Sequence, residues 1–197
     1  MNTEIVSLRR PTAWSLARHW DVVHVVLGSL YMALLAQVEI PLHPVPITLQ
    51  PFALFTLALF QGSRKSFFSL TLYLVEGSMG LPVFPAAHAD PLWILAPSAG
   101  YLVSFPFAAY VAGRLTETSP FSWKRILIGL GAAQWLIYLV GASWLGVIVG
   151  WQVAITAGIL PFIVFDMVKL LAAGAAKMGV ESFKQLCRND KIKGGNT

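Results

Sequence analysis

Long apolar runs, separated by short polar connectors, dominate the chain from residue 22 to residue 178. The hydrocarbon core of a bilayer is about 30 Å thick and needs about 20 helical residues to cross it. The pattern predicts six spanning segments, at Val22–Val38, Phe52–Gly62, Phe67–Leu81, Ala99–Leu115, Ile126–Gly150 and Ile155–Met178. The second is short for a spanning helix, so we expect it to tilt, to recruit connector residues or to pack against its neighbours.

Composition supports an all-α integral membrane protein, a compact bundle of six transmembrane helices. The chain is 56% hydrophobic and 12% charged, with a mean hydropathy of +0.68, whereas soluble domains carry about 25% charged residues. We expect residues 1–20 to be a cytoplasmic N-terminal segment, 21–180 the membrane domain and 181–197 a polar cytoplasmic tail. The first of these lacks a small-residue cleavage site before Asp21, which favours a retained segment over a removable signal peptide.

The basic residues test this topology. Thirteen of the fourteen lysines and arginines fall on one side of the six-segment arrangement, and the connectors of the other side carry Glu39 and Asp90. The positive-inside rule therefore places both termini in the cytoplasm. Because the cations are spread over several short loops instead of one face, they do not indicate a nucleic-acid partner.

The remaining basic residue, Lys169, shares the last apolar stretch with Asp166. Each charge at mid-membrane depth costs roughly 2.5–3.5 kcal/mol, and at i,i+3 spacing the two side chains share one helix face and can neutralise each other. The pair lies on the outer half of its segment, near Pro161, where an outward-opening pocket could reach it. Ligand recognition is one interpretation, and a purely structural ion pair is the other. Glu76, the other acidic residue at membrane depth, is compatible with a protonated carboxyl, a polar interior or a snorkelling side chain.

The first outer connector contains Pro44-Val-Pro-Ile-Thr-Leu-Gln50. Prolines restrict its backbone, and non-helical backbone at membrane depth is tolerated where protein buries it or where it lines a cavity. In an extended strand Thr48 and Gln50 would point the same way. This favours a lid that presents two hydrogen-bonding groups to a pocket, with a rigid surface loop as the alternative.

Around the second outer connector, glycines such as Gly77 allow close backbone approach. Phe84, Trp93 and Tyr101 could form aromatic walls, although interfacial aromatic belts have the same composition. Ser29 and Ala33 form a small-xxx-small step that permits close helix contact. From spacing alone we favour an internal packing seam over a docking surface.

Several signatures are missing from the sequence. It contains no P-loop and no His-Glu-x-x-His, its four histidines are scattered, and its one cysteine, Cys187, excludes an intramolecular disulfide. We therefore predict neither a metal site nor a cofactor. An intramembrane enzyme using Asp166 or Glu76 as an acid–base group is the alternative class, but it lacks a nucleophile or metal at a plausible spacing.

Together these features resemble the BioY family, the biotin-binding S components of energy-coupling-factor transporters. The resemblance rests on the segments Pro44–Gln50, Tyr73–Phe84, Ala96–Leu102 and Gly113-Arg114, and on Pro161 with Asp166 and Lys169. It implies a six-helix S-component fold with an external loop between helices 1 and 2 that caps the substrate. It also implies biotin as ligand, a transmembrane coupling subunit and two cytoplasmic ATPases as partners, and the bacterial cytoplasmic membrane as location. The implied mechanism is toppling of the bundle in the lipid bilayer, with Ser29 and Ala33 docking on the coupling subunit.

The resemblance also implies roles for the candidate site residues. Asp166 would accept from the ureido N–H groups of biotin, and Lys169 would support Asp166 and donate to a ligand oxygen. The further substrate-binding candidates are Thr48, Gln50, Tyr101, Gly77, Phe84 and His88. Residues 85–90 depart from the Gly-rich turn typical of the family, and His88 or Asp90 could replace its contacts. An S component for another small vitamin is the alternative ligand assignment.

Overall fold

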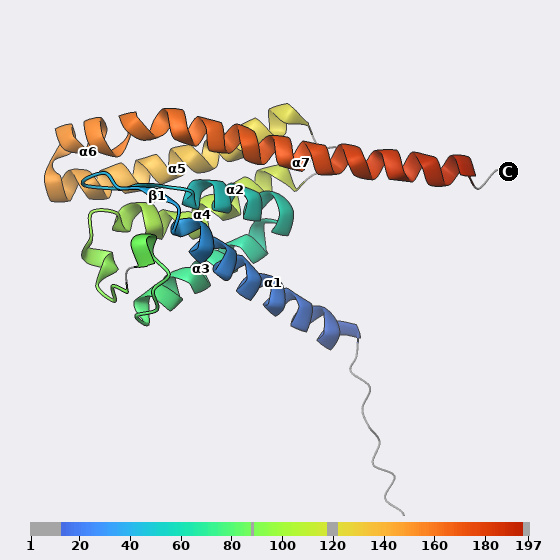
Figure 1. The fold of residues 1–197 in the computed structure, drawn as a ribbon, viewed down its shortest axis with the longest axis horizontal. Helices are drawn as coiled ribbons and strands as arrows, with labels where there is room; N and C mark the ends of the chain where they lie inside the picture. Colours follow the sequence, from blue (N-terminus) through green and yellow to red (C-terminus); the bar gives the residue numbers. More distant parts are fainter. Residues whose placement is uncertain (1–12, 88, 118–121, 195–197) are drawn as a thin grey trace, which may run out of the picture.

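The structure is a computed structural model that describes residues 13–87, 89–117 and 122–194 (Figure 1). Its helices are α1 (Ala13–Ala36), α2 (Gln50–Gln61), α3 (Ser63–Ser78), α4 (Ala99–Thr116), α5 (Trp123–Val149), α6 (Trp151–Gly158) and α7 (Leu160–Gly194). Two-residue strands, β1 (Glu39–Ile40) and β2 (Ile47–Thr48), and two 3₁₀ turns, η1 (Pro85–Ala87) and η2 (Trp93–Leu95), lie in the connectors. The all-α prediction is confirmed, and the first five segments match α1 to α5 apart from shifts at their ends.

The predicted sixth segment is wrong in one respect, because the structure divides it into α6 and α7 at Ile159. Ile159 has φ −122° and ψ −57°, outside helical geometry. Pro161 explains the break, since its ring nitrogen cannot donate and the ring crowds the carbonyl one turn earlier. Beyond the bundle α7 continues as helix through the predicted tail as far as Gly194, and it projects past the other helices (Figure 1).

The short helix α2 lies at the centre of the bundle. Nine of its twelve residues are buried, and it packs against α1, α3, α4 and α7. Of the three alternatives expected for this short segment, the structure shows packing against neighbouring helices. Its first turn carries Pro51, whose missing N–H would have no intrahelical partner there. Its last turn leads into Gly62, which adopts φ 83° and starts α3.

At the same end of the bundle, Glu117 follows α4 and accepts a hydrogen bond from the backbone N–H of Ser63. Burial tends to raise the pKa of this carboxyl, but the hydrogen bonds from Ser63 and the guanidinium groups of Arg114 and Arg64 outweigh it. The pKa of Glu117 is lowered as a result. The carboxylate thus joins the α2–α3 turn to the end of α4.

The outer surface of the helices is apolar. Large side chains such as Leu34, Phe68, Trp135, Val147 and Val164 are all more than half exposed, as expected for a bundle that faces lipid. By length and composition alone, α5 and the α6–α7 unit up to Arg188 are long enough to cross a membrane. The other helices are shorter, and they pack against neighbouring helices of the bundle.

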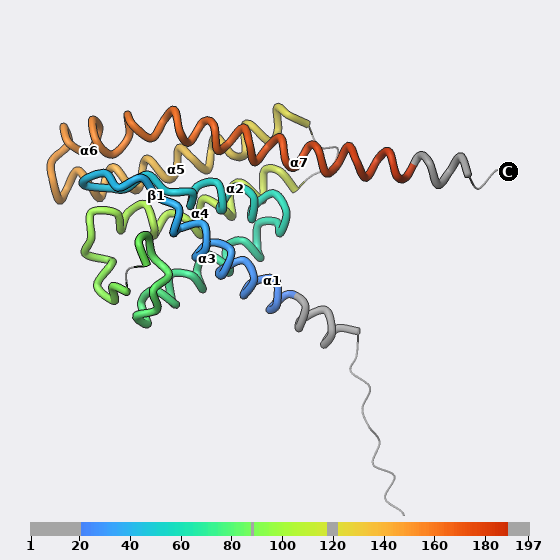
Figure 2. Tube along the Cα trace, in the orientation of Figure 1, coloured from blue at the N-terminus to red at the C-terminus, as the bar shows by residue number. Residues whose placement is uncertain are grey.

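The connectors between α1 and α2 and between α3 and α4, which the sequence predicts to be the outer ones, cover one end of the bundle (Figure 2). In the first, β1 and β2 pair antiparallel, with Glu39 opposite Thr48 and Ile40 opposite Ile47. In the second, η2 is tied to α3 by the indole N–H of Trp93, which donates to Ser78 Oγ at 2.9 Å. The connectors thus form an ordered cover over the helix ends near α2, α4 and α7.

Candidate functional site

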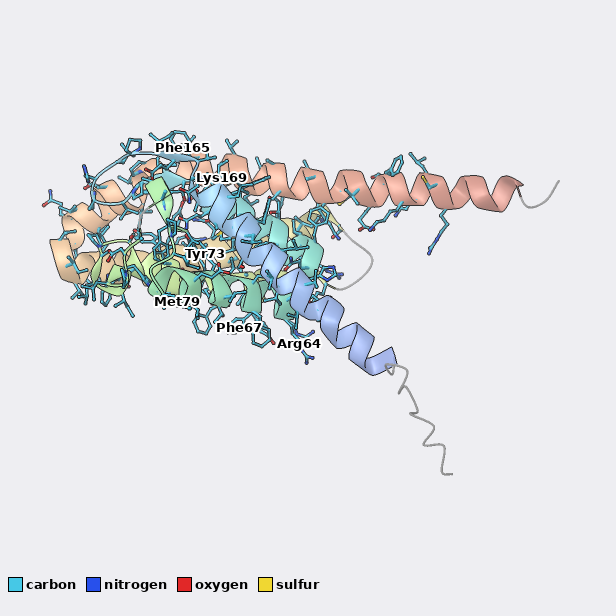
Figure 3. The ribbon with its side chains drawn as sticks, turned by 60° about the horizontal axis from the view of Figure 1, so that its bottom comes forward. Arg64, Phe67, Tyr73, Met79, Phe165 and Lys169 are labelled. Atoms are coloured by element: carbon cyan, nitrogen blue, oxygen red, sulfur yellow. The ribbon has the colours of Figure 1, made fainter. Side chains whose placement is uncertain are left out.

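Asp166 and Lys169 form a buried ion pair on α7. Lys169 Nζ lies 2.8 Å from Asp166 Oδ1, and the two residues are 7% and 2% exposed. The i,i+3 spacing places both on one face of α7, and their burial shows that this face points into the bundle. Figure 3 labels Lys169 on this helix. The structure therefore brings together the two charges that the sequence singled out.

Two residues of α5 complete the surroundings of the carboxylate. Gln134 Nε2 and Tyr138 OH each donate to Asp166 Oδ2 at 2.9 Å. They are four residues apart and therefore share a face of α5. Sequence reasoning missed both, although a lone glutamine with a tyrosine one turn later in an apolar segment was an available signal. With Lys169, the carboxylate accepts from three donors.

The ion pair lines a small cavity beneath the outer connectors. The cavity offers about 60 Å³ to the centres of water molecules. Its polar lining comes from α2, α4, α5 and α7, from Thr48 in the first connector and from Ser98 directly before α4, and the rest is apolar or proline. The lining includes Pro46, Thr48, Gln50, Pro85, Tyr101, Leu102, Phe105, Ile137, Tyr138, Phe162, Asp166 and Lys169.

Thr48 and Gln50 both reach this cavity, but not through an extended strand. Thr48 ends β2, whereas Gln50 is the first residue of α2, so the predicted strand geometry is wrong for Gln50. The hydroxyl of Thr48 donates to Gln50 Oε1 at 3.0 Å, and Gln50 Nε2 donates to Tyr73 OH at 2.8 Å. This chain links the first connector to α3, from which Tyr73 enters the interior of the bundle (Figure 3).

Tyr101 contributes its ring to the cavity and uses its hydroxyl elsewhere. The hydroxyl donates to the carbonyl of Gly158, the last residue of α6, at 2.8 Å. The ring stacks on Phe162 with centroids 6.4 Å apart and 19° between planes. The side chain therefore braces the α6–α7 break and forms an aromatic wall, and Phe162 is a second wall that the sequence did not indicate.

Gly77 and Phe84 do not line this cavity. The Phe84 ring packs directly on Gly77, where a Cβ would overlap it, and contacts Tyr73 edge to face at 5.5 Å. Phe84 and Asp90 instead line a neighbouring outer cavity. His88 lies outside the residues that the structure describes, so its predicted contact stays a prediction.

Ser29 of α1 is fully buried, and its side chain donates to Glu76 Oε1 of α3 at 3.0 Å. These contacts agree with the internal packing seam that its spacing favoured, and its docking role stays a prediction. Ala33 is partly exposed, and its docking role stays a prediction.

The side chains that line the cavity are suited to ligand recognition. The cavity presents a carboxylate, an ammonium group and an amide against apolar walls, and these groups can match N–H donors and carbonyl or carboxylate acceptors of a ligand. Among the described residues, no group of three or more His, Cys, Asp and Glu side chains could hold a metal ion.

The sequence matches the profile of the BioY family over residues 8–185. A protein of Pyrococcus horikoshii named "Probable biotin transporter BioY" is 37% identical over 152 residues, which cover 76% of this chain and 90% of that protein. The "Biotin transporter BioY" of Thermotoga maritima is 35% identical over 155 residues, covering 75% of this chain and 89% of that protein.

The fold is similar to a solved crystal structure, that of the S-component for biotin from an ECF-type ABC transporter. The TM-score is 0.74, the sequence identity is 21%, and the match covers 85% of this chain and 93% of the other. The likeness confirms the predicted S-component fold.

Proposed function

Because the chain belongs to the BioY family, we propose that it is the biotin-binding subunit of a vitamin uptake transporter. It captures biotin at the outer face of a bacterial cytoplasmic membrane, with both termini in the cytoplasm. An ATP-driven module, made of a transmembrane coupling subunit and two ATPases, powers delivery to the cytoplasm, and the bundle topples in the membrane in that step. The family is one of transporters and not of enzymes, which sets aside the acid–base enzyme considered from the sequence.

The observation that carries the proposal is the buried Asp166–Lys169 pair at the floor of an otherwise largely apolar cavity. A carboxylate has about four acceptor positions, and three of these are taken by Lys169, Gln134 and Tyr138. The remaining position suits one ureido N–H of biotin. Lys169 has three donors, of which one is used by Asp166, so the others suit the ureido carbonyl or the carboxylate of the ligand.

The apolar walls suit the thiophane ring and the aliphatic chain of biotin. Leu102 and Phe105 of α4, Ile137 of α5 and Phe162 of α7 line the cavity. In this state the cavity has room for only a few water molecules, which is less than the bicyclic ligand needs. Binding therefore requires the connectors above the cavity to move, a lid role that fits Thr48 at the end of β2.

Binding of labelled biotin to the purified chain in lipid nanodiscs tests the proposal. We expect saturable binding that unlabelled biotin displaces and that other small vitamins do not. Asp166→Asn should abolish it, because the amide replaces an acceptor oxygen by a donor beside Lys169. The matched control is Asp21→Asn, which neutralises an aspartate in an exposed ion pair with Lys65. Absence of biotin binding by the wild-type chain would refute the proposal.

A further inference from the structure

Two adjacent cavities lie at the covered end of the bundle. The outer one offers about 350 Å³ to the centres of water molecules and shares Pro46, Pro85, Ser98 and Leu102 with the smaller inner cavity that contains the Asp166–Lys169 pair. Pro46 belongs to the first connector and Pro85 to the second. The two prolines therefore form the part of the partition that connector movement can displace.

Gln37, directly after α1, holds the Pro85 side of this partition. Its Nε2 donates to the carbonyls of Val83 and Phe84 at 3.3 and 3.2 Å, and its Oε1 accepts from the N–H of Ala87 at 2.7 Å. These three backbone groups lie on both sides of Pro85 in the chain. Gln37 lines neither cavity itself, so it can act on a ligand only through the connector.

The backbone that Gln37 holds is one that alanine disfavours. Ala86 and Ala87 have φ values of 55° and 54°, in the left-handed region where a Cβ approaches the following carbonyl oxygen. Such a turn persists only where surrounding contacts over-determine it. The hydrogen bond from Ala87 to Gln37 is a contact of this kind.

We propose that Gln37 is a positioning residue that keeps Pro85 between the two cavities and thereby sets how slowly a bound ligand leaves the inner one. This inference rests on the proposed function for the identity of the ligand. It gives the alanine turn after Pro85 a part in the site, because a side chain directly after α1 holds this turn in place.

Gln37→Glu is the sharpest test, because it keeps the side-chain length and the acceptor for Ala87 but cannot donate to the two carbonyls. Gln37→Leu removes all three contacts with the second connector, together with the hydrogen bond that Nε2 donates to the Ala33 carbonyl at 3.0 Å. Gln152→Glu on α6 is the matched control, since it is the same change at an exposed glutamine. Association and dissociation rates of labelled biotin are measured in nanodiscs, together with the number of sites per protein.

We expect Gln37→Glu to speed dissociation about tenfold, the effect of losing one to two hydrogen bonds. Gln37→Leu should dissociate at least as fast, and Gln152→Glu should behave as wild type, with site numbers unchanged in all three. A role in folding alone would lower the number of sites and leave the dissociation rate of the remaining sites unchanged. That result would overturn the inference.

Hydrogen exchange without ligand separates this inference from the proposed function. Peptides containing Val83–Ala87 should exchange faster in Gln37→Glu than in wild type, whether or not the protein binds biotin. Equal exchange in the two proteins would overturn the inference. Failure of the wild-type chain to bind biotin would instead refute the proposed function.

Discussion

Replacing Lys169 by methionine would leave the Asp166 carboxylate buried without its cation. At the observed 2.8 Å between Nζ and Oδ1, the attraction is about 6 kcal/mol for an effective dielectric constant of about 20. Desolvating two ions offsets most of that gain, so the pair adds little net stability, whereas removing one partner costs about 3–5 kcal/mol. We expect Lys169→Met to destabilise the fold by an amount in this range.

The double substitution Asp166→Asn with Lys169→Met gives the decisive comparison. It removes both charges, and the amide oxygen of the new asparagine can still accept from Gln134 and Tyr138. We therefore expect the double variant to lose only about 1–2 kcal/mol, less than Lys169→Met alone, with a coupling energy of at least about 2 kcal/mol. Ligand binding should be lost in all three variants, so stability and binding separate.

Unfolding by dodecyl sulfate in mixed micelles, followed by the fluorescence of the seven tryptophans, measures these free energies. The reasoning fails if each single substitution costs less than about 1 kcal/mol and the double variant equals their sum. Additivity of that kind would mean that each charge is separately solvated and that the two do not neutralise each other inside the bundle.

Three further outcomes are expected. Tyr138→Phe removes one donor from the buried carboxylate and should cost about 1–3 kcal/mol in the same unfolding assay. Gly77→Ala should cost about 1–3 kcal/mol because the new methyl overlaps the Phe84 ring, whereas Gly131→Ala, with no neighbouring atom within 4 Å of the new Cβ, should not destabilise. Because the pKa of Glu117 is lowered in the folded state, its contribution is complete above the unfolded pKa and is lost as pH falls through the folded pKa. Thermal unfolding between about pH 6 and 3 should therefore be less pH-dependent in Glu117→Gln.

The sequence predicted the helices well because each apolar run is bounded by charges, glycines or prolines. It predicted the Asp166–Lys169 pair because charge at membrane depth is costly enough to stand out. It did not predict Gln134 and Tyr138, since one glutamine and one tyrosine in an apolar helix are unremarkable until α5 is placed against α7. Which face of α5 contacts α7 depends on tertiary packing, and this packing brings Gln134 and Tyr138 to Asp166.

Proline illustrates a second limit. Pro161 stands at the break between α6 and α7, whereas Pro106 lies inside α4, which continues through it. Neighbouring helices can satisfy the groups that a proline frees, so the residue alone does not tell a break from a continuous helix. Likewise, the Phe84 ring packs on Gly77. Sequence spacing could not show that this contact keeps the ring out of the cavity that contains Asp166.

The position of α2 has a consequence for the membrane itself. Gln50 lines the cavity and Gln61 ends the helix at the opposite side, a length of about 18 Å at 1.5 Å per residue. Ala53, Leu54 and Phe55 are fully buried along it. Transfer of an ion along such an apolar interior is costly, because the ion would lose its hydration without a compensating partner. We therefore expect this helix to oppose ion leakage, so that the subunit can lie in the bilayer without dissipating electrochemical gradients.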